Sequence, residues 1–145
     1  EKHGKSLFET IKEKAGEGRD VFFVFGGTDV ELREQIRKIT ETKDNAIIVA
    51  SYGTFSTGIS IRRLHNIIFA SPSKSRIRIL QSIGRQLRKS EHKDTAKLYD
   101  IADDIHWKSY KNHTLNHFER RLKIYQSEGF DYKKISLHIQ GNNYE

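Results

Sequence analysis

The sequence predicts an α/β domain in which helices cover both faces of a mostly parallel sheet. Short runs of β-branched and aromatic residues are apolar along their whole length, which is typical of strands buried on both faces. Segments with helical periodicity separate these runs, and strands that alternate with helices form parallel sheets. The four predicted strands are residues 21–25, 46–50, 66–70 and 97–101.

Four segments before, between and after these strands repeat apolar residues every three to four positions, as one face of a helix does. The second of them starts at Thr28 or Asp29, residues that cap helices well. The last, 112–125, sets its apolar residues against Arg120, Arg121 and Lys123. The predicted buried positions are Leu7 and Ile11; Leu32, Ile36 and Ile39; Ile77, Leu80, Ile83 and Leu87; and Leu115, Phe118, Leu122 and Tyr125. The tail alternates Ile135, Leu137 and Ile139 with polar residues, which suits an edge strand or a docking arm.

The composition narrows the classes of function. The chain has 145 residues, the size of one domain, and 26 Lys and Arg against 19 acidic residues give a net charge of +7. Such a basic excess favours nucleic acid as partner, or equally marks a solvated basic surface. The lack of Cys excludes disulfides and thiolate metal sites and fits a reducing compartment, and no apolar run is long enough to cross a membrane. Because Met is absent even from position 1, we expect a fragment or a processed piece.

The segment QSIGRQLR, residues 81–88, concentrates phosphate-binding chemistry on one helix face. Gln81, Gly84, Arg85 and Arg88 fall at i, i+3, i+4 and i+7, so they share that face. A helical Gly costs about 1 kcal/mol against Ala, which suggests close approach of another group. Two guanidinium forks on a rigid face suit phosphate oxygens, although the spacing alone also fits a solvated basic face.

This segment resembles motif VI of the superfamily-two helicases, whose pattern is Gln/His-x-x-Gly-Arg-x-x-Arg. IIVASYGTFSTGISI, residues 47–61, is similar to motif V, and residues 64–89 are similar to the strand, loop and helix that lead through motif VI. VFFVFGGTDVELREQI, residues 21–36, resembles the strand and helix that hold Gly-x-x-x-x-x-Arg. Each motif alone is weak, but together they cover nearly the whole chain in family order. The resemblance is closest to phage recombination helicases.

The resemblance implies a RecA-like three-layer domain at residues 1–110, whose first strand is missing from the chain. It implies that residues 111–145 form a C-terminal helix and tail that pack on the same domain. The implied partners are DNA, single-stranded or branched, and the N-terminal RecA-like domain of the same parent chain. ATP then binds between the two domains, and Mg²⁺ is held mainly by the N-terminal one.

Site residues follow from the resemblance position by position. Arg88 is the implied arginine finger and Gln81 helps to orient the site, while Arg85 is either the partner of the finger or part of a salt bridge between motifs. Gly58, Ser60 and Gly84 are implied near ATP, but the family more often has Asp where Ser60 stands, which leaves a ribose contact open. The implied nucleic-acid contacts are Ser51, Thr54, Thr57, Gly27, Arg33 and Lys74. Thr54 and Thr57 also fit ordinary turn and cap chemistry.

Two local patterns are expected to carry no site. Gly4-Lys5-Ser6 matches the end of a phosphate-binding loop, but its first Gly would lie outside the chain, and the resemblance places these residues at the start of a helix. Lys5 and Ser6 should therefore face solvent. His113 and His117 have helical metal-ligand spacing without a carboxylate at a matching turn, so we expect no metal site.

The function implied by the resemblance is that of the second motor domain of an ATP-dependent DNA helicase or translocase, an enzyme that drives unwinding or branch migration. The isolated chain should be inactive because the Walker elements are absent. One alternative is an RNA helicase or another superfamily-two translocase, which shares motifs V and VI. The other is a non-catalytic basic nucleic-acid-binding domain, against which the intact motif VI residues argue. The expected location is the cytoplasm of a bacterial or phage-infected host cell, with no membrane partner.

Overall fold

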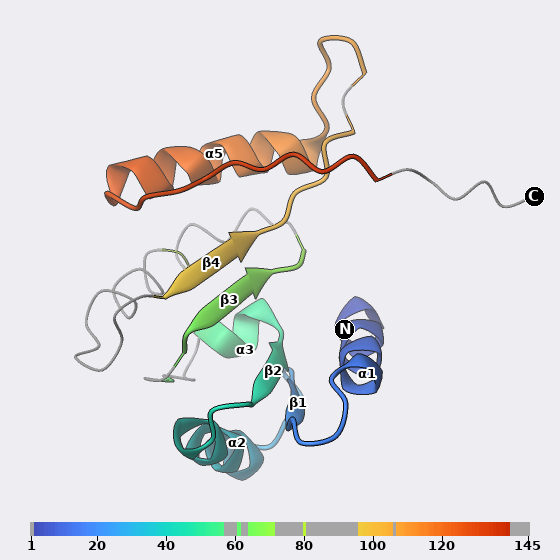
Figure 1. Cartoon of the computed structure of the whole chain (residues 1–145), viewed down its shortest axis with the longest axis vertical. Helices are drawn as coiled ribbons and strands as arrows, with labels where there is room; N and C mark the ends of the chain where they lie inside the picture. Colours follow the sequence, from blue (N-terminus) through green and yellow to red (C-terminus); the bar gives the residue numbers. More distant parts are fainter. Residues whose placement is uncertain are drawn as a thin grey trace, which may run out of the picture. The chain divides into compact units, whose positions relative to one another are not determined.

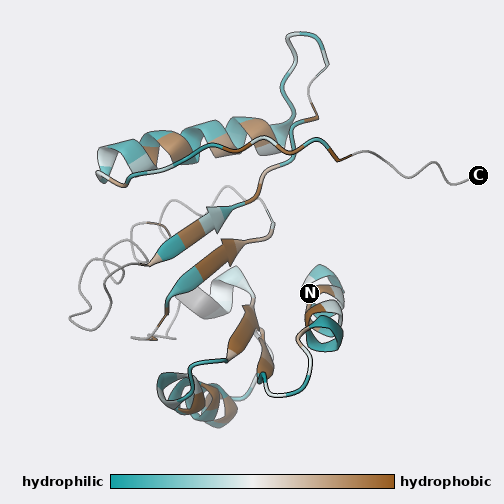
Figure 2. Ribbon diagram, viewed as in Figure 1, coloured by the Kyte–Doolittle hydropathy of each residue, from teal (hydrophilic) through white to brown (hydrophobic). Residues whose placement is uncertain are grey.

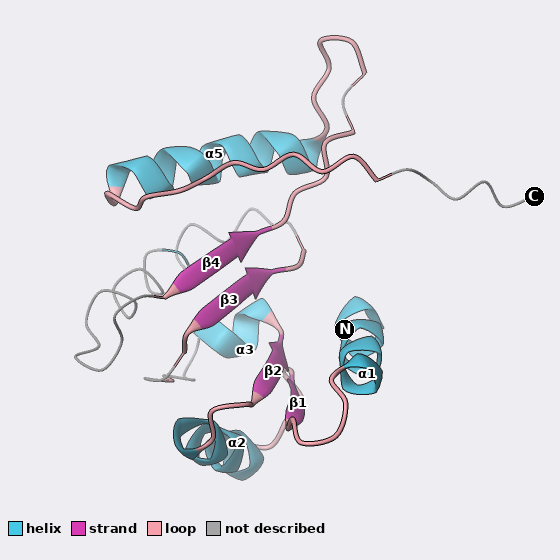
Figure 3. Ribbon diagram, in the orientation of Figure 1, coloured by secondary structure: helices cyan, strands magenta, loops and turns pink. Residues whose placement is uncertain are grey.

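The computed structural model describes residues 2–56, 61, 64–71, 80, 96–105 and 107–139. The chain divides into two units, Glu1–Ala102 and Asp103–Glu145. Within the described residues the first unit holds α1 (Lys2–Lys14), β1 (Val21–Val24), α2 (Val30–Thr42), β2 (Ile47–Ala50), α3 (Tyr52–Ser56), β3 (Asn66–Phe69) and β4 (Lys97–Asp100), and the second holds α5 (His113–Ser127) (Figures 1 and 3). None of these helices is long and apolar enough to cross a membrane.

The strands pair in parallel, as the sequence predicts. β1 pairs with β2 from Val21↔Ile47 to Val24↔Ala50, and β3 pairs with β4 from Asn66↔Lys97 to Phe69↔Asp100 (Figure 1). The alternation of parallel strands with helices confirms the α/β class and is consistent with a RecA-like fold. The described strands form two sheets of two strands each, whereas the sequence predicts one larger sheet.

Helices cover both faces of the β1–β2 pair, because successive strand side chains point to opposite faces. On one face, Val24 joins Ile36 of α2 and Ile61 in a buried cluster. On the other face, the Phe23 ring stacks on Phe8 of α1 with centroids 5.6 Å apart. Both strands are hydrophobic along their length in Figure 2, as burial on two sides requires. The predicted helix on each face of the sheet is therefore found for this strand pair.

The buried face of α2 differs from the predicted one. Asp29 caps the helix as predicted, accepting a hydrogen bond from the Glu31 amide at 2.9 Å. Leu32, however, is 47% exposed, and Thr40 takes the second buried position beside Ile36. The Thr40 hydroxyl donates to two backbone carbonyls of its own helix, so its burial leaves no polar group unsatisfied. The helix is thus turned toward Thr40 and away from Leu32.

The prediction that Arg121 lies on the polar face of α5 is wrong. The helix starts after Asn112 and buries Leu115 and Tyr125, as predicted, but Arg121 is only 2% exposed and lies on the same side. Its guanidinium carbon lies 5.7 Å from the centre of the Phe118 ring. A long aliphatic stem and a cation–π contact allow an arginine to occupy a position on an apolar face.

Gly129 ends α5 in the left-handed conformation, with φ of 70°. The amides of Gly129 and Phe130 donate to the carbonyls of Gln126 and Tyr125, at 3.1 and 2.9 Å, which is a Schellman termination. Residues 131–139 beyond it form no strand, so the edge-strand prediction is wrong for this segment. Ile135, Leu137 and Ile139 are 67%, 82% and 92% exposed, and none of the described strands pairs with this segment. The docking-arm alternative, and the packing of residues 111–145 on the first domain, stay predictions.

Candidate functional site

The carboxyl ends of β1 and β2 meet at one edge, because the strands are parallel and Val24 pairs with Ala50. The Ser51 amide continues the ladder, donating to the Val24 carbonyl at 3.0 Å. The turn 26–28 and the segment 51–56 therefore leave the two strands side by side. In open α/β sheets, ligands bind outside this edge of the strands. The arrangement places the predicted motif V segment next to the predicted Gly-x-x-x-x-x-Arg segment.

The turn between β1 and α2 is held by its own polar groups. The Thr28 amide donates to the Phe25 carbonyl, and the Phe25 amide donates to the Thr28 hydroxyl, both at 3.0 Å. Arg33, from the first turn of α2, donates through Nε to the Thr28 carbonyl and through Nη2 to the Gly26 carbonyl, both at 2.9 Å. Thr28 is 8% exposed, so the hydrogen bonds of this residue are partly shielded from water. The predicted site residue Arg33 thus braces the turn in this structure.

Gly27, another predicted site residue, is exposed on that turn. A Cβ atom at this position would lie 2.8 Å from Cε2 of Phe25, closer than real Cβ contacts come. Glycine is required here by close packing on Phe25, whose ring in turn stacks on Phe23 with centroids 5.2 Å apart. The absence of a side chain also leaves the backbone of the turn exposed at this position.

The segment after β2 is tied both to itself and to β3. The hydroxyls of Ser51 and Thr54 are hydrogen-bonded at 2.7 Å, and Thr54 is 3% exposed. The Tyr52 hydroxyl donates to the Ser71 carbonyl at 3.2 Å, and its ring lies 5.9 Å from that of Phe69. The ends of β2 and β3 are thereby linked through one side chain. Sequence reasoning missed the role of Tyr52, and a lone tyrosine between Ser and Gly carries no pattern that would reveal it.

The structure brings four of the predicted site residues, Gly27, Arg33, Ser51 and Thr54, to this one edge. The others lie outside the described residues: Thr57, Gly58, Ser60, Lys74, Gln81, Gly84, Arg85 and Arg88. Leu80, which directly precedes the motif VI segment, is 2% exposed, as the predicted apolar anchor of that segment should be.

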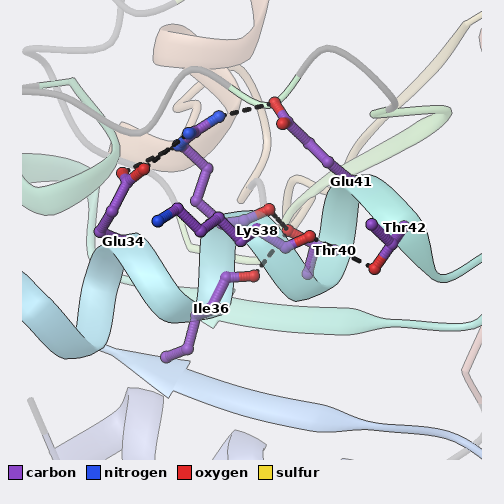
Figure 4. Close-up of polar contacts among 7 residues, drawn as sticks. Glu34, Ile36, Lys38, Thr40, Glu41 and Thr42 are labelled. Carbon is purple, nitrogen blue, oxygen red and sulfur yellow. Dashed lines mark hydrogen bonds and ion pairs between the residues drawn. The ribbon is translucent and has the colours of Figure 1, made fainter.

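On the outer side of α2, Arg37 joins two carboxylates of its own helix (Figure 4). Its Nε and Nη2 donate to the two oxygens of Glu34, at 2.9 and 2.6 Å, and its Nη1 lies 2.9 Å from Glu41. The hydrogen bond from Arg37 is the main cause that lowers the pKa of Glu34, and the same bond raises the pKa of Arg37. The i, i+3 and i+4 spacing of these residues is the sequence signal that could have revealed the network.

Gly4-Lys5-Ser6 lies within α1, and Lys5 and Ser6 are exposed, as predicted. The Cβ position of Gly4 is 3.3 Å from Cε2 of Phe23, so this glycine serves the packing of α1 on β1. The rings of His113 and His117 lie 6.4 Å apart, and the described part of the chain holds no cluster of three or more metal-ligating side chains.

Comparison with known proteins shows what the sequence of this chain is similar to. Over 94% of its length the chain is 38% identical to the ATP-dependent DNA helicase uvsW of Enterobacteria phage T4, across 147 aligned residues. The chain is similar to part of a DNA helicase. The aligned region spans 29% of the uvsW sequence. This match confirms the resemblance to a superfamily-two helicase C-terminal domain that the motif series indicates, and uvsW is itself a phage helicase. No protein-family model matches the chain, and no solved structure matches it significantly.

Proposed function

We propose that this chain is the second RecA-like motor domain of an ATP-dependent DNA helicase or translocase that unwinds or branch-migrates DNA. The observation that carries the proposal is the 38% identity to the DNA helicase uvsW over 94% of the chain. The parallel-strand architecture supports it, because the predicted motif segments at residues 26–33 and 51–54 leave neighbouring strands at one edge.

In this proposal the motif VI residues act on ATP from the second domain. Arg88 is the arginine finger, Arg85 is its partner or a salt bridge between motifs, and Gln81 orients the site. Gly58, Ser60 and Gly84 lie near the nucleotide. A positioned arginine stabilises the charge on the transferring phosphoryl group and is typically worth about 10³–10⁵ in rate. ATP and Mg²⁺ are held mainly by the N-terminal motor domain of the parent protein, so the isolated chain turns over no ATP.

The proposed DNA contacts lie on the strand edge and use backbone and hydroxyl groups, which bind phosphate without reading sequence. Gly27, Ser51, Thr54, Thr57 and Lys74 supply them. Arg33 makes two hydrogen bonds to the turn, which favour a positioning role. In that role it holds the backbone around Gly27 in the conformation that contacts the DNA strand. The cytoplasm of an infected bacterial cell is the place where such a motor would meet its DNA.

The experiment that tests the proposal is ATP turnover by the full-length parent protein, wild type against Arg88→Ala. We expect DNA-stimulated turnover to fall about 10³-fold or more while ATP binding, measured separately, is largely kept. Arg19→Ala is the matched control, because this exposed arginine lies before β1, at the other end of the strands. Near-normal turnover in Arg88→Ala would contradict the proposal and favour a basic binding surface. Stimulation by single-stranded RNA in place of DNA would identify the RNA-helicase alternative.

A further inference from the structure

Two aromatic side chains stand in solvent at the tip of a tight turn in the second unit. Trp107 and Tyr110 are 75% and 74% exposed. Their backbones form an antiparallel bridge, with the Trp107 amide donating to the Tyr110 carbonyl at 3.0 Å and the Tyr110 amide donating back at 2.9 Å. Lys108 and Ser109 form the apex. Residues 107–110 form the aromatic tip of this unit.

The aromatic tip is held in shape by its backbone and by its base. Lys108 has φ of 54°, a left-handed conformation that residues other than glycine adopt only where the surroundings impose it. Asn112, the residue before α5, accepts a hydrogen bond from the Ile105 amide at 3.3 Å and donates to the Asp103 carbonyl at 3.0 Å. The Thr114 hydroxyl also donates to the Asp103 carbonyl, at 2.9 Å. The base of the loop is thus tied to the start of α5, and the backbone that carries the two aromatic residues is held in place.

The charge around the tip suits a polyanion. Lys108 lies at the apex, between Trp107 and Tyr110 in the sequence, and is exposed. Residues 105–111 contain no acidic side chain, and the nearest acidic residues in the sequence are Asp103 and Asp104 at the base of the loop. Lys111 is bound to Glu119 at 2.5 Å, so among the described residues 107–111 Lys108 is the cation outside that ion pair. A protein–protein interface usually involves about 20–30 residues on each side, which is more than a loop of this size can supply by itself. Within the described residues 103–105 and 107–112, the large apolar side chains that the loop exposes are Ile105, Trp107 and Tyr110, which is a footprint for one or two bases.

We propose that the aromatic tip binds single-stranded DNA by stacking bases on Trp107 and Tyr110, with Lys108 beside a backbone phosphate. The inference rests on the proposed function, because it assumes that the motor meets single-stranded DNA. It adds a binding site outside the motif segments. Aromatic stacking tolerates every base, since each has a π-face, and so it suits a motor that moves along any sequence.

Trp107 is the sole tryptophan of the chain, so its fluorescence reports on the tip directly. The first measurement titrates the 145-residue chain with a single-stranded oligothymidylate, following Trp107 emission together with the anisotropy of the labelled oligonucleotide. We expect Trp107 emission to be quenched in step with binding. Hairpin duplex DNA of equal charge should quench it far less, because its bases are already stacked on each other.

Variants then separate stacking from charge. Trp107→Ala should weaken oligothymidylate binding by about 5- to 150-fold without altering the salt dependence, and Trp107→Phe should restore most of the affinity. Lys108→Ala should lower the slope of log K against log salt by about 0.7, the value for one phosphate on a single strand. Leu137→Ala is the matched control, since Leu137 is 82% exposed in the same unit and should leave binding unchanged.

Each outcome decides the proposal. Quenching with loss of affinity in Trp107→Ala and recovery in Trp107→Phe supports it. Binding without quenching, wild-type affinity in Trp107→Ala, or no binding by the chain overturns it and leaves a protein contact as the use of the tip. The proposed motor function is judged separately by turnover in Arg88→Ala, so the failure of one can be told from the failure of the other. The wild-type titration needs no variant to fold, and circular dichroism checks those that are made.

Discussion

Arg33 donates from Nη2 to the carbonyl oxygen of Gly26 at 2.9 Å, across the turn that joins β1 to α2. The same guanidinium donates from Nε to the Thr28 carbonyl at 2.9 Å. The planar guanidinium of Arg33 therefore binds two carbonyls of the turn. The backbone of Arg33 belongs to α2, the helix that follows this turn. The position of the Gly26–Gly27 backbone is set by a side chain that lies several residues further along the chain.

Replacement of Arg33 by lysine should loosen this turn although the charge is kept. An ammonium group is a point donor and cannot reach both carbonyls with the geometry of a fork. We expect the free energy of unfolding to fall by about 1–2 kcal/mol, measured by urea denaturation. Lys38→Ala, at an exposed position of the same helix, is the control and should change little. An unchanged unfolding midpoint in Arg33→Lys would show that the fork contributes nothing to the turn.

Gly26 and Gly27 should respond differently to alanine. A Cβ at Gly27 meets Phe25 at 2.8 Å, whereas a Cβ at Gly26 meets no heavy atom within 4 Å. Gly27→Ala should therefore cost about 1 kcal/mol or more by displacing the Phe25 ring, and Gly26→Ala should stay within about 0.5 kcal/mol of wild type. Thermal melts of the two variants provide the comparison. Equal effects would mean that the Phe25 ring moves aside at no cost.

Thr54 allows the two interpretations of the motif V hydroxyls to be separated. Because Thr54 is 3% exposed and bonded to Ser51, Thr54→Val should lower the free energy of unfolding by about 1–3 kcal/mol, and Thr54→Ser should cost less because the hydroxyl is kept. If Thr54 also contacts DNA, Thr54→Val in the parent protein should lower DNA-stimulated ATP turnover even when the assay is run well below the unfolding temperature of the variant. Reduced stability with normal turnover would assign Thr54 to turn chemistry alone.

The Glu34–Arg37 pair should make stability depend on pH in the acid range. The folded state lowers the pKa of Glu34, chiefly through the hydrogen bond from Arg37, so the pair contributes stability only while Glu34 is ionised. The stability difference between wild type and Glu34→Gln should be present at neutral pH. It should vanish as the pH falls below the ordinary glutamate pKa and through the lowered pKa of the folded state.

Urea denaturation of both proteins over this pH range measures that difference. Glu9→Gln, at an exposed position of α1, is the control and should show no such loss relative to wild type. Glu34 and Arg37 are both accessible to solvent, so salt should reduce the contribution of this ion pair to stability. A difference that persists at low pH would contradict an electrostatic origin.

The sequence by itself determined the four strands, the helices α1, α2 and α5, and the family likeness. Each predicted strand is found with its end displaced by one residue at most. The cap at Asp29 begins α2 where predicted, and α5 begins one residue after the predicted start at Asn112. These features are local: an apolar run is a strand because it can be buried on both faces, and a capping side chain acts within its own turn. The series of motifs likewise lies in the order of the residues alone.

Only the tertiary structure decided which side chains are buried and which are used for packing. It exposed Leu32 and buried Thr40 and Arg121, and it directed Arg33 back onto the turn before its own helix. It also left residues 131–139 without a strand partner, although their pattern alternates. Burial and strand pairing depend on neighbours that are remote in the sequence. A polar side chain such as Thr40 can be buried because its hydroxyl donates to backbone carbonyls, and the apolar pattern of the sequence does not show which polar residue this will be.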